Sequence, residues 1–298
     1  MSCDYPMEPY PKVIINAAIT GMIPTKRDTP HVPVTEDEIV QDAVACHMAG
    51  AAIIHLHIRD EQGNPCYKAE KYGRIIRRIR EKCNVIICVS TSGRFFKDFE
   101  QRSEVLFLEG IEKPEMASIT TGSLNFPKHA SVNPPDIIFR LAETMLEQGI
   151  KPEIEIFDSG MLNFAKHLHK KLGLPQPLYF NLIFGSLGGI PARIEDIAYL
   201  INCLPEESLW SAAGIGVFQL PVNLTALAAG GGVRVGLEDN IYFDYEKKEL
   251  ATNVQLIERI SYMAKVIRRE LADADEARRM LCISPVDYSF HQSREFSQ

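Results

Sequence analysis

The chain has 298 residues, of which 46% are hydrophobic and 24% are charged, with 19 glycines and 18 prolines. This is ordinary globular composition, which excludes a disordered or fibrous protein, and the length fits one large α/β barrel or two smaller domains. A net charge of −7 and the lack of a Lys/Arg-rich run argue against nucleic acid as a partner.

The sequence also predicts the compartment. It contains no run of about 18 uncharged apolar residues, and its first 12 residues hold three prolines and two acids rather than the apolar core of a signal peptide. Its seven cysteines are an odd number without a CxxC pair, which predicts neither a disulfide framework nor a cysteine-rich zinc site. We therefore expect a cytoplasmic protein with reduced thiols and no membrane partner.

Short runs rich in Val, Ile and Leu alternate with longer amphipathic segments along the whole chain. We expect eight strands, near residues 13–18, 53–58, 85–90, 116–119, 153–157, 178–183, 209–214 and 233–236. We expect helices at residues 35–49, 68–82, 98–108, 135–147, 160–171, 193–203, 222–229 and 253–271. The first helix opens with a capping box, in which Thr35 caps the helix and Glu38 reaches back.

Eight strands, each followed by a helix, favour a closed (β/α)8 TIM barrel, because closure removes both sheet edges. The competing fold is a doubly wound open sheet. Its cofactor-binding forms carry a Gly-rich turn directly after the first strand, and here that strand runs into residues 18–22 without GxGxxG. We therefore expect a single barrel domain over residues 1–298, with a short N-terminal lead (1–11) and a polar C-terminal tail (about 288–298).

The strongest local signal is the histidine pair in the second expected strand. Because side chains alternate along a strand, His55 and His57 share one face, and that face points into the barrel. They lie at the C-terminal end of the strand, where barrel enzymes place their chemistry, and two imidazoles supply half of a zinc site. The alternative is a pair of histidines that hydrogen-bond within a polar core layer.

A third metal ligand is available at the end of the eighth strand. Glu238 and Asp239 follow it, and in a closed barrel this strand lies two places from the histidine pair. Two histidines and one carboxylate with an open fourth position describe a catalytic zinc ion. Neighbouring side chains diverge, so one carboxylate binds metal and the other is free to act as a base near Arg234. The alternative is an acidic pair that caps the following turn.

Polar groups also end the third, fourth and fifth expected strands. Hydroxyls and glycine amides that could bind a substrate carboxylate or carbonyl occur at Ser90, Thr91, Gly93, Thr120 and Thr121, with Arg94 adding charge. Such clusters are also common in plain turns. The acids Glu153 and Glu155 of the fifth strand share the inward face, which is costly for charge unless it is paired or functional, and Arg234 is the expected partner.

Taken together, these segments resemble the β-keto acid cleavage enzyme family, whose founding activity is 3-keto-5-aminohexanoate cleavage. The resemblance runs from about Lys12 to Leu281. Its most specific pieces are residues 20–26 (TGMIPTK), 30–35 (PHVPVT), 51–60 (AAIIHLHIRD), 151–158 (KPEIEIFD), 218–221 (FQLP) and 233–240 (VRVGLEDN).

The resemblance implies a zinc-dependent barrel, commonly a homotetramer, that condenses a β-keto acid with acetyl-CoA and cleaves the product to acetoacetate and a new acyl-CoA. One Zn²⁺ per chain would be held by His55, His57 and Glu238. Asp239 would be the catalytic base, held by Arg234. Apart from the resemblance, the inward acid Glu155 is the next candidate for the base.

The resemblance also implies where the keto acid binds. Ser90 or Thr91, and Thr120 or Thr121, would bind the keto acid carboxylate. The family member that acts on the amino-bearing substrate is expected to carry an acid in the loop after the first strand. Residues 21–27 of this chain contain none, which argues against an amino-bearing keto acid.

Two other functions remain open on the sequence. A metal-dependent hydrolase of the amidohydrolase type also joins a His-x-His strand to an acid at strand eight, but it needs further histidines at middle strands. Residues 156–158 and 182–184, which end the fifth and sixth expected strands, contain none. A barrel that only binds a small anion would leave the inward histidines and acids without a purpose.

Overall fold

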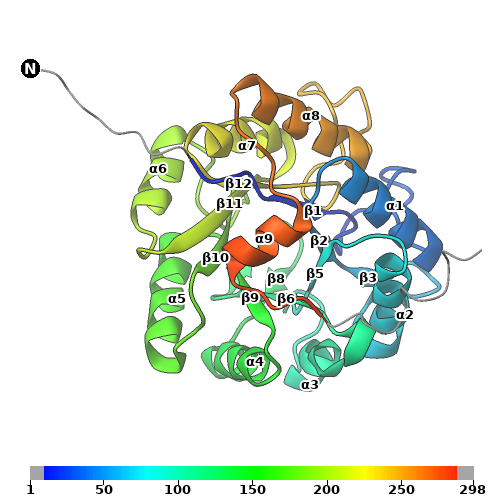
Figure 1. Cartoon of the computed structure of the whole chain (residues 1–298), viewed down its shortest axis with the longest axis vertical. Coiled ribbons are helices and arrows are strands. Elements are labelled where there is room, and N and C mark those ends of the chain that lie inside the picture. The colour runs from blue at the N-terminus through cyan, green and yellow to red at the C-terminus, as the bar shows by residue number, and fades with distance from the viewer. Residues whose placement is uncertain (1–9, 287–298) are drawn as a thin grey trace, which may run out of the picture.

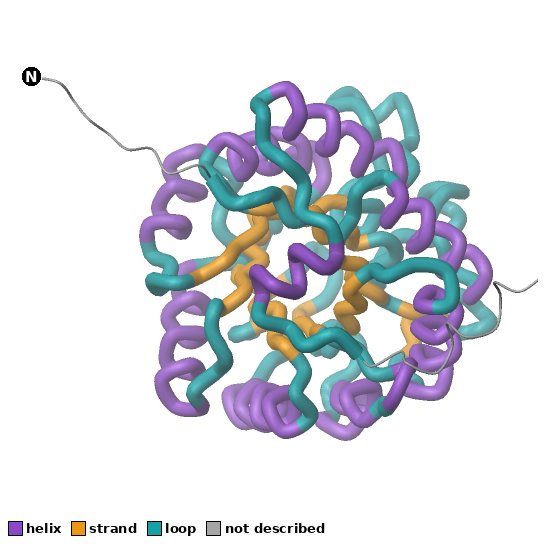
Figure 2. Tube along the Cα trace, in the orientation of Figure 1, coloured by secondary structure: helices purple, strands orange, loops and turns teal. Residues whose placement is uncertain are grey.

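Eight parallel strands close into a barrel in the computed structural model, which describes residues 10–286 (Figures 1 and 2). In chain order they are β1 (Ile15–Ala18), β2 (Ile53–Leu56), β5 (Ile86–Val89), β6 (Met116–Thr120), β9 (Lys151–Ile156), β10 (Leu178–Phe184), β11 (Ser208–Gly214) and β12 (Gly232–Val235). Around the barrel the order is β1, β12, β11, β10, β9, β6, β5, β2, so first and last strands are neighbours. The expected (β/α)8 barrel is confirmed.

Helices surround the barrel and cover the outer faces of its strands, as Figure 2 shows. They are α1 (Glu36–Met48), α2 (Ala69–Arg80), α3 (Phe99–Ser103), α4 (Pro135–Glu147), α5 (Ser159–Leu172), α6 (Ile194–Asn202), α7 (Gln219–Ala228) and α8 (Asn253–Val266). The capping box of α1 is present, because the backbone N–H of Glu38 donates to Thr35 and the N–H of Thr35 donates to Glu38. Such a box satisfies two of the donors that a helix start leaves free.

Two short hairpins depart from the expected pattern. The second expected strand ends at Leu56, and β3 (Ile58–Arg59) pairs antiparallel with β4 (Pro65–Cys66) instead of continuing the barrel. A second hairpin joins β7 (Leu124–Asn125) to β8 (Ala130–Ser131). Two-residue strands carry no readable alternation, so the sequence pattern does not reveal them.

Two helices also differ from expectation. The expected helix at 98–108 is α3 followed by a 3-10 turn at Glu104–Phe107. The expected helix at 253–271 ends at Val266, and Arg268 adopts a left-handed φ of 58° just beyond it. A left-handed residue terminates a helix. A separate helix α9 (Ala274–Leu281) then begins with its own capping box at Asp273.

Helix α9 closes the N-terminal end of the barrel, and Figure 1 shows it lying across the ring of strands. Its apolar side chains Ala277 and Leu281 belong to the same buried cluster as Ile53 and Ile86 from the barrel strands. With that end covered, the open end is the one at which the strands reach their C-termini. Barrel enzymes build their sites at that end.

The remaining observations on the fold concern the chain ends and membranes. Residues 1–9 of the expected lead, and the expected tail at 288–298, lie outside the described residues. Among residues 10–286, none of the helices has both the length and the apolar character needed to cross a bilayer.

Candidate active site

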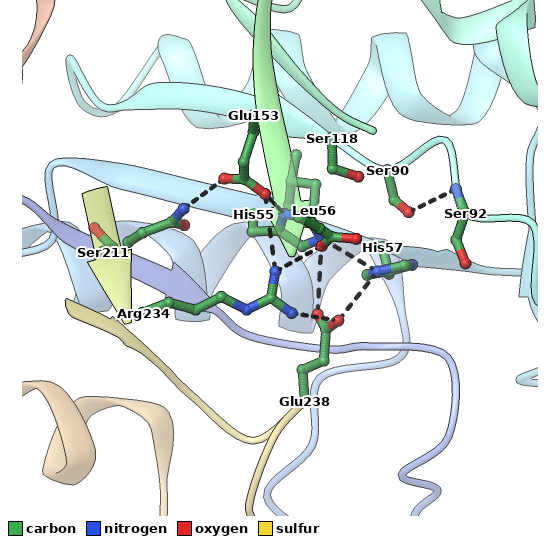
Figure 3. Close-up of polar contacts among 12 residues, drawn as sticks. His55, Leu56, His57, Ser90, Ser92, Ser118, Glu153, Ser211, Arg234 and Glu238 are labelled. Carbon is green, nitrogen blue, oxygen red and sulfur yellow. Dashed lines mark hydrogen bonds and ion pairs between the residues drawn. The ribbon is translucent and has the colours of Figure 1, made fainter. Parts of the chain in front are cut away.

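The two histidines meet at the C-terminal end of β2. His55 lies within the strand and His57 directly after it, and both side chains are buried. Their Nε2 atoms face each other at 3.3 Å (Figure 3). The shared face that strand alternation predicts is therefore present, although the strand itself stops before His57.

Glu238 completes the group from the loop after β12. Its Oε1 lies 3.4 Å from Nε2 of His57, and its Oε2 lies 3.9 Å from Nε2 of His55. The Oε2 atom is buried and has no hydrogen-bond partner among the described residues. Gly21, with φ of 62°, lies against this side chain, and a Cβ there would come within 2.6 Å of Cγ of Glu238. Only glycine fits that approach.

This arrangement has the dimensions of a metal site. The ligand atoms of His55, His57 and Glu238 all lie within 4.8 Å of one another. Two nitrogens bound at zinc's usual distance in a tetrahedral site would lie about 3.3 Å apart, which matches the two imidazoles. The unpartnered oxygen of Glu238 is a further ligand atom, so the residues present fit a divalent ion.

Glu153 orients the first histidine. Its Oε1 accepts a hydrogen bond from Nδ1 of His55 at 2.8 Å, and its Oε2 accepts one from Nδ2 of Asn16 at 2.5 Å. A carboxylate only accepts, so Nδ1 is the donor and Nε2 is left to face His57. Burial disfavours the charged imidazole, but the Glu153 carboxylate outweighs it and raises the pKa of His55. For His57 burial prevails, and the pKa is lowered.

Arg234 on β12 links the carboxylates of the site. Its Nε donates to Asp239 at 3.0 Å, its Nη1 to Glu155 at 3.0 Å and its Nη2 to Glu238 at 2.7 Å. Oε1 of Glu153 lies 3.8 Å from Nη1. Burial disfavours the guanidinium charge, but these carboxylates outweigh it and hold the pKa of Arg234 above its ordinary value.

The charges of this cluster do not balance. Four carboxylates surround one guanidinium, which leaves an excess of three negative charges when the acids are ionised and the histidines neutral. Uncompensated charge is costly away from water. A divalent cation beside the histidines would remove most of that excess, which agrees with the geometric fit.

The pKa of Asp239 is raised above its ordinary value. Burial raises it, and the Arg234 guanidinium, which lowers it, does not compensate fully. For Glu238, by contrast, its contacts with the His57 imidazole and the Arg234 guanidinium outweigh burial and bring the pKa well below its ordinary value. The two neighbouring acids are therefore set apart by their surroundings, as an acid or base and a ligand would be.

Part of this cluster forms the floor of a cavity of about 650 Å³, which is lined by His57, Glu155, Arg234, Glu238 and Asp239. Ser90 and Thr120 lie in its wall, and Oγ1 of Thr120 donates to Glu155 at 2.8 Å. The structure does not bring Thr91, Thr121 or Gly93 to this wall. The hydroxyls of Thr91 and Thr121 donate to the backbone carbonyls of Ser118 and Met161 instead.

Gly93 packs against the second hairpin. Its carbonyl accepts the backbone N–H of Val132 at 3.3 Å, and a Cβ at Gly93 would lie 2.4 Å from the carbonyl oxygen of Val132. The glycine thus permits close contact between the loop after β5 and the hairpin, rather than lining the cavity.

Two functional contributions were missed by the sequence reasoning. The orienting contact between Glu153 and His55 is one, and the only signal for it was the inward acid itself. The other is Arg59 on β3, which is fully buried and donates to the carbonyls of Gly21 and Pro24 at 2.7 and 3.0 Å. It thereby holds the loop after β1, which forms part of the cavity wall.

Sequence comparison identifies relatives over nearly the whole chain. Residues 12–283 match the family described as beta-keto acid cleavage enzyme. A 3-keto-5-aminohexanoate cleavage enzyme of Acetoanaerobium sticklandii is 38% identical over 275 residues, which is 92% of this chain and 99% of that protein. A 3-oxoadipate:acetyl-CoA acetyltransferase of Cupriavidus necator is 36% identical over 273 residues, 90% of this chain and 94% of that one.

Comparison with solved structures supports the same fold. The apo structure of ObcA superposes with a TM-score of 0.74 at 20% identity, over 85% of this chain and 66% of that chain. At this identity the likeness concerns the fold alone. The resemblance inferred from the sequence motifs is confirmed by the family match and by the two relatives.

Proposed function

The chain belongs to the beta-keto acid cleavage enzyme family, and on that premise we propose that it condenses a β-keto acid with acetyl-CoA and cleaves the adduct to acetoacetate and a new acyl-CoA. One observation on this chain's own residues supports the proposal. In the potential ligand group of His55, His57 and Glu238, the last two line the same cavity as the buried Asp239. The names of the relatives supply the β-keto acid and the acetyl-CoA.

The net reaction exchanges two acyl groups. The C2 carbon of the keto acid loses a proton and attacks the carbonyl carbon of acetyl-CoA, and the CoA thiolate leaves. The thiolate then attacks the original keto carbon, and the bond between that carbon and C2 breaks. Carbons 1 and 2 of the keto acid leave as part of acetoacetate after C2 takes back a proton, and the remaining acyl group leaves on CoA.

In this proposal Asp239 removes the proton from C2. Burial raises its pKa, which brings a carboxylate closer to the strength that a general base needs near neutral pH. Arg234 holds Asp239 through Nε and orients it toward the cavity. Glu155, held by Nη1 of the same guanidinium and in the same cavity wall, is the next candidate for the base.

The keto acid carboxylate is assigned to Ser90 and Thr120. Both line the cavity beside the acids of the floor. A carboxylate that enters the cavity loses its water shell. The hydroxyl of Ser90 can donate to it directly, and the hydroxyl of Thr120 would donate to it in place of Glu155.

His55, His57 and Glu238 would hold one Zn²⁺ per chain. When bound, the ion would act as a Lewis acid that stabilises negative charge developing on the keto oxygen. His55 is held in its orientation by Glu153, and Gly21 leaves room for Glu238 to reach the histidines.

We also propose a homotetramer in the cytoplasm. Large apolar side chains are exposed on and around α6, namely Leu187, Ile194 and Tyr199, which is typical of a surface that another subunit covers. The six cysteines in the described part of the chain are all free thiols, as expected in a reducing compartment. Light scattering on the purified protein tests the tetramer.

Product analysis tests the proposed reaction. The zinc-loaded enzyme is incubated with acetyl-CoA labelled with ¹³C at the acetyl carbonyl and with a panel of β-keto acids. We expect the label at C3 of acetoacetate, with an unlabelled new acyl-CoA. Hydrolysis without CoA dependence would support the amidohydrolase alternative, and binding without turnover the anion-binding one.

A variant of the ligand set tests the metal assignment. His57→Ala should lose both the bound ion and activity, because two ligand atoms do not replace three. Metal content is measured by elemental analysis. A fully metallated and active variant would contradict the ligand assignment.

A further inference from the structure

One cation in the cavity wall has no acid partner among the described residues. Arg94 follows β5 and is half-buried, and its guanidinium carbon lies 3.3 Å from the ring centroid of Phe126. Within residues 10–286, its guanidinium forms no hydrogen bond or ion pair. Buried arginines are normally paired with an acid. An unpaired one in the wall of a ligand cavity indicates an anionic group on the ligand.

The acids on the cavity floor do not supply that partner. Glu155, Glu238 and Asp239 act on Arg94 through space, but none lies within 4 Å of its guanidinium. All three are already bonded to Arg234. The charge of Arg94 is therefore available to a ligand.

The outer part of the cavity has more cations than acids. Lys128 and Lys247 line it together with Arg94. Apart from the acids of the floor, Asp28 is the one acid among the described residues that line the cavity, and the backbone N–H and hydroxyl of Thr25 donate to it at 2.8 and 2.7 Å. An ammonium group on a substrate would meet repulsion in this part of the cavity, whereas a carboxylate would meet attraction.

Arg94 and Thr120 contact different parts of the cavity lining. Thr120 lies beside the floor, because its hydroxyl donates to Glu155, which contacts Arg234. Arg94 instead lies over Phe126, next to the hairpin of β7 and β8. The apolar side chains of Leu124, Phe126, Phe157 and Ile183 also line the cavity and can pack against a chain of methylene groups.

We propose that the substrate is a dicarboxylic β-keto acid, whose distal carboxylate binds the guanidinium of Arg94. The proposal rests on the proposed function and names its substrate class. The C1 carboxylate, which C2 separates from the keto carbon, binds at the floor, the methylene carbons beyond the keto carbon pack on the apolar wall, and the second carboxylate pairs with Arg94. A planar guanidinium stacked on an aromatic ring is well suited to bind a carboxylate through two hydrogen bonds.

Two six-carbon substrates of different charge test this assignment. 3-Oxoadipate carries the distal carboxylate, and 3-oxohexanoate carries a methyl group in its place. For the wild-type enzyme with zinc and acetyl-CoA, we expect kcat/KM to be at least about 10-fold higher for 3-oxoadipate. A charge-assisted pair strengthens binding by about 10- to 100-fold. Arg94→Gln should therefore reduce the ratio of the two kcat/KM values by about that factor.

The control is Arg27→Gln. Arg27 is exposed in the loop after β1 and is not part of the cavity wall. This variant removes one positive charge at the same end of the barrel and should leave the ratio unchanged. Circular dichroism on both variants verifies folding, and the wild-type preference tests the proposal without any variant.

Three outcomes would overturn the proposal. An equal loss on both substrates would assign Arg94 to the carboxylate that they share. A rise confined to the KM of acetyl-CoA would assign it to a phosphate of CoA. A wild-type enzyme that prefers 3-oxohexanoate would exclude a dicarboxylic substrate.

A binding measurement separates this proposal from the proposed function. Adipate has both carboxylates but no keto group, and hexanoate has only one carboxylate. By calorimetry, wild-type enzyme should bind adipate at least about 10-fold more tightly than hexanoate, and Arg94→Gln should remove the difference. If no keto acid were cleaved but this binding preference were observed, the result would support the proposed subsite and contradict the proposed reaction. Equal binding of adipate by both proteins would overturn the subsite.

Discussion

Nδ1 of His55 lies 2.8 Å from Oε1 of Glu153, although 98 residues separate them in the chain. The two side chains come from β2 and β9, which are not neighbours in the barrel, and they meet across its interior. The contact directs Nε2 of His55 toward His57. A carboxylate that fixes a metal-binding histidine contributes to metal affinity without touching the metal.

Glu153→Gln should therefore weaken zinc binding by about 10- to 100-fold, because the amide holds the ring less firmly and lowers the basicity of Nε2. Competition with a chromophoric chelator measures the affinity. The control is Glu155→Gln, which changes an inward acid on the same strand that contacts Thr120 and Arg234 rather than a histidine. Equal zinc affinity in wild type and Glu153→Gln would contradict the orienting role.

Asp239→Asn should keep the fold and the zinc but lower kcat by about 10²- to 10⁴-fold, which is the usual contribution of a general base. The asparagine side chain keeps an oxygen that can accept from Arg234 but cannot take the C2 proton. The measurement is kcat under saturating keto acid and acetyl-CoA, with metal content determined on the same sample. A near-normal kcat would show that another residue is the base, and Glu155 would be tested next.

The barrel could be predicted from the sequence because its strands and helices show strong hydrophobic periodicity. The eight apolar runs and the helices between them can be identified without knowing which residues contact one another. The same alternation placed His55 and His57 on one face and Glu153 and Glu155 on another inward face. Helix α9 was missed because its eight residues follow a break at Arg268 that no proline or glycine marks.

Contacts across the barrel could not be derived in this way. Alternation says which way a side chain points, but the distance from Glu153 to His55 depends on the register of strands that are not neighbours. The hydroxyls illustrate the same limit. Thr120 and Thr121 are adjacent and chemically alike, yet Thr120 lines the cavity and Thr121 donates to a backbone carbonyl.

Replacing both Ser90 and Thr120 by Ala should raise the KM for the keto acid more than that for acetyl-CoA, by about 10-fold for two lost hydrogen bonds. Both side chains line the cavity. Thr91→Ala is the matched control, because its hydroxyl donates to the carbonyl of Ser118. Initial rates with each substrate varied in turn provide the two KM values. Equal increases in both would contradict the placement of the carboxylate.

Glu38 links the loop at the cavity mouth to helix α1. Its Oε2 accepts the backbone N–H groups of Val34 and Thr35 at 2.9 and 3.0 Å, and its Oε1 lies 2.7 Å from Nζ of Lys26. Burial opposes the charge, but these contacts outweigh it and lower the pKa of Glu38 from 4.5 to about 2. The unfolded chain therefore binds the proton more readily than the folded protein between these two values.

A carboxyl group whose pKa is depressed by folding stabilises the protein above its unfolded pKa, and this contribution is lost as the pH falls through the folded value. Glu38→Gln should thus lower the free energy of unfolding at pH 7 by about 1 kcal/mol, the size of a capping contribution at a partly exposed position. The difference should shrink as the pH falls from about 4.5 toward 2. Urea unfolding at several pH values measures this difference.

The control is Glu100→Gln, which removes an exposed pair with Arg140 and should change the free energy of unfolding by no more than a few tenths of a kcal/mol. A loss in Glu38→Gln that stayed constant down to pH 3 would show that the contribution comes from side-chain shape rather than charge.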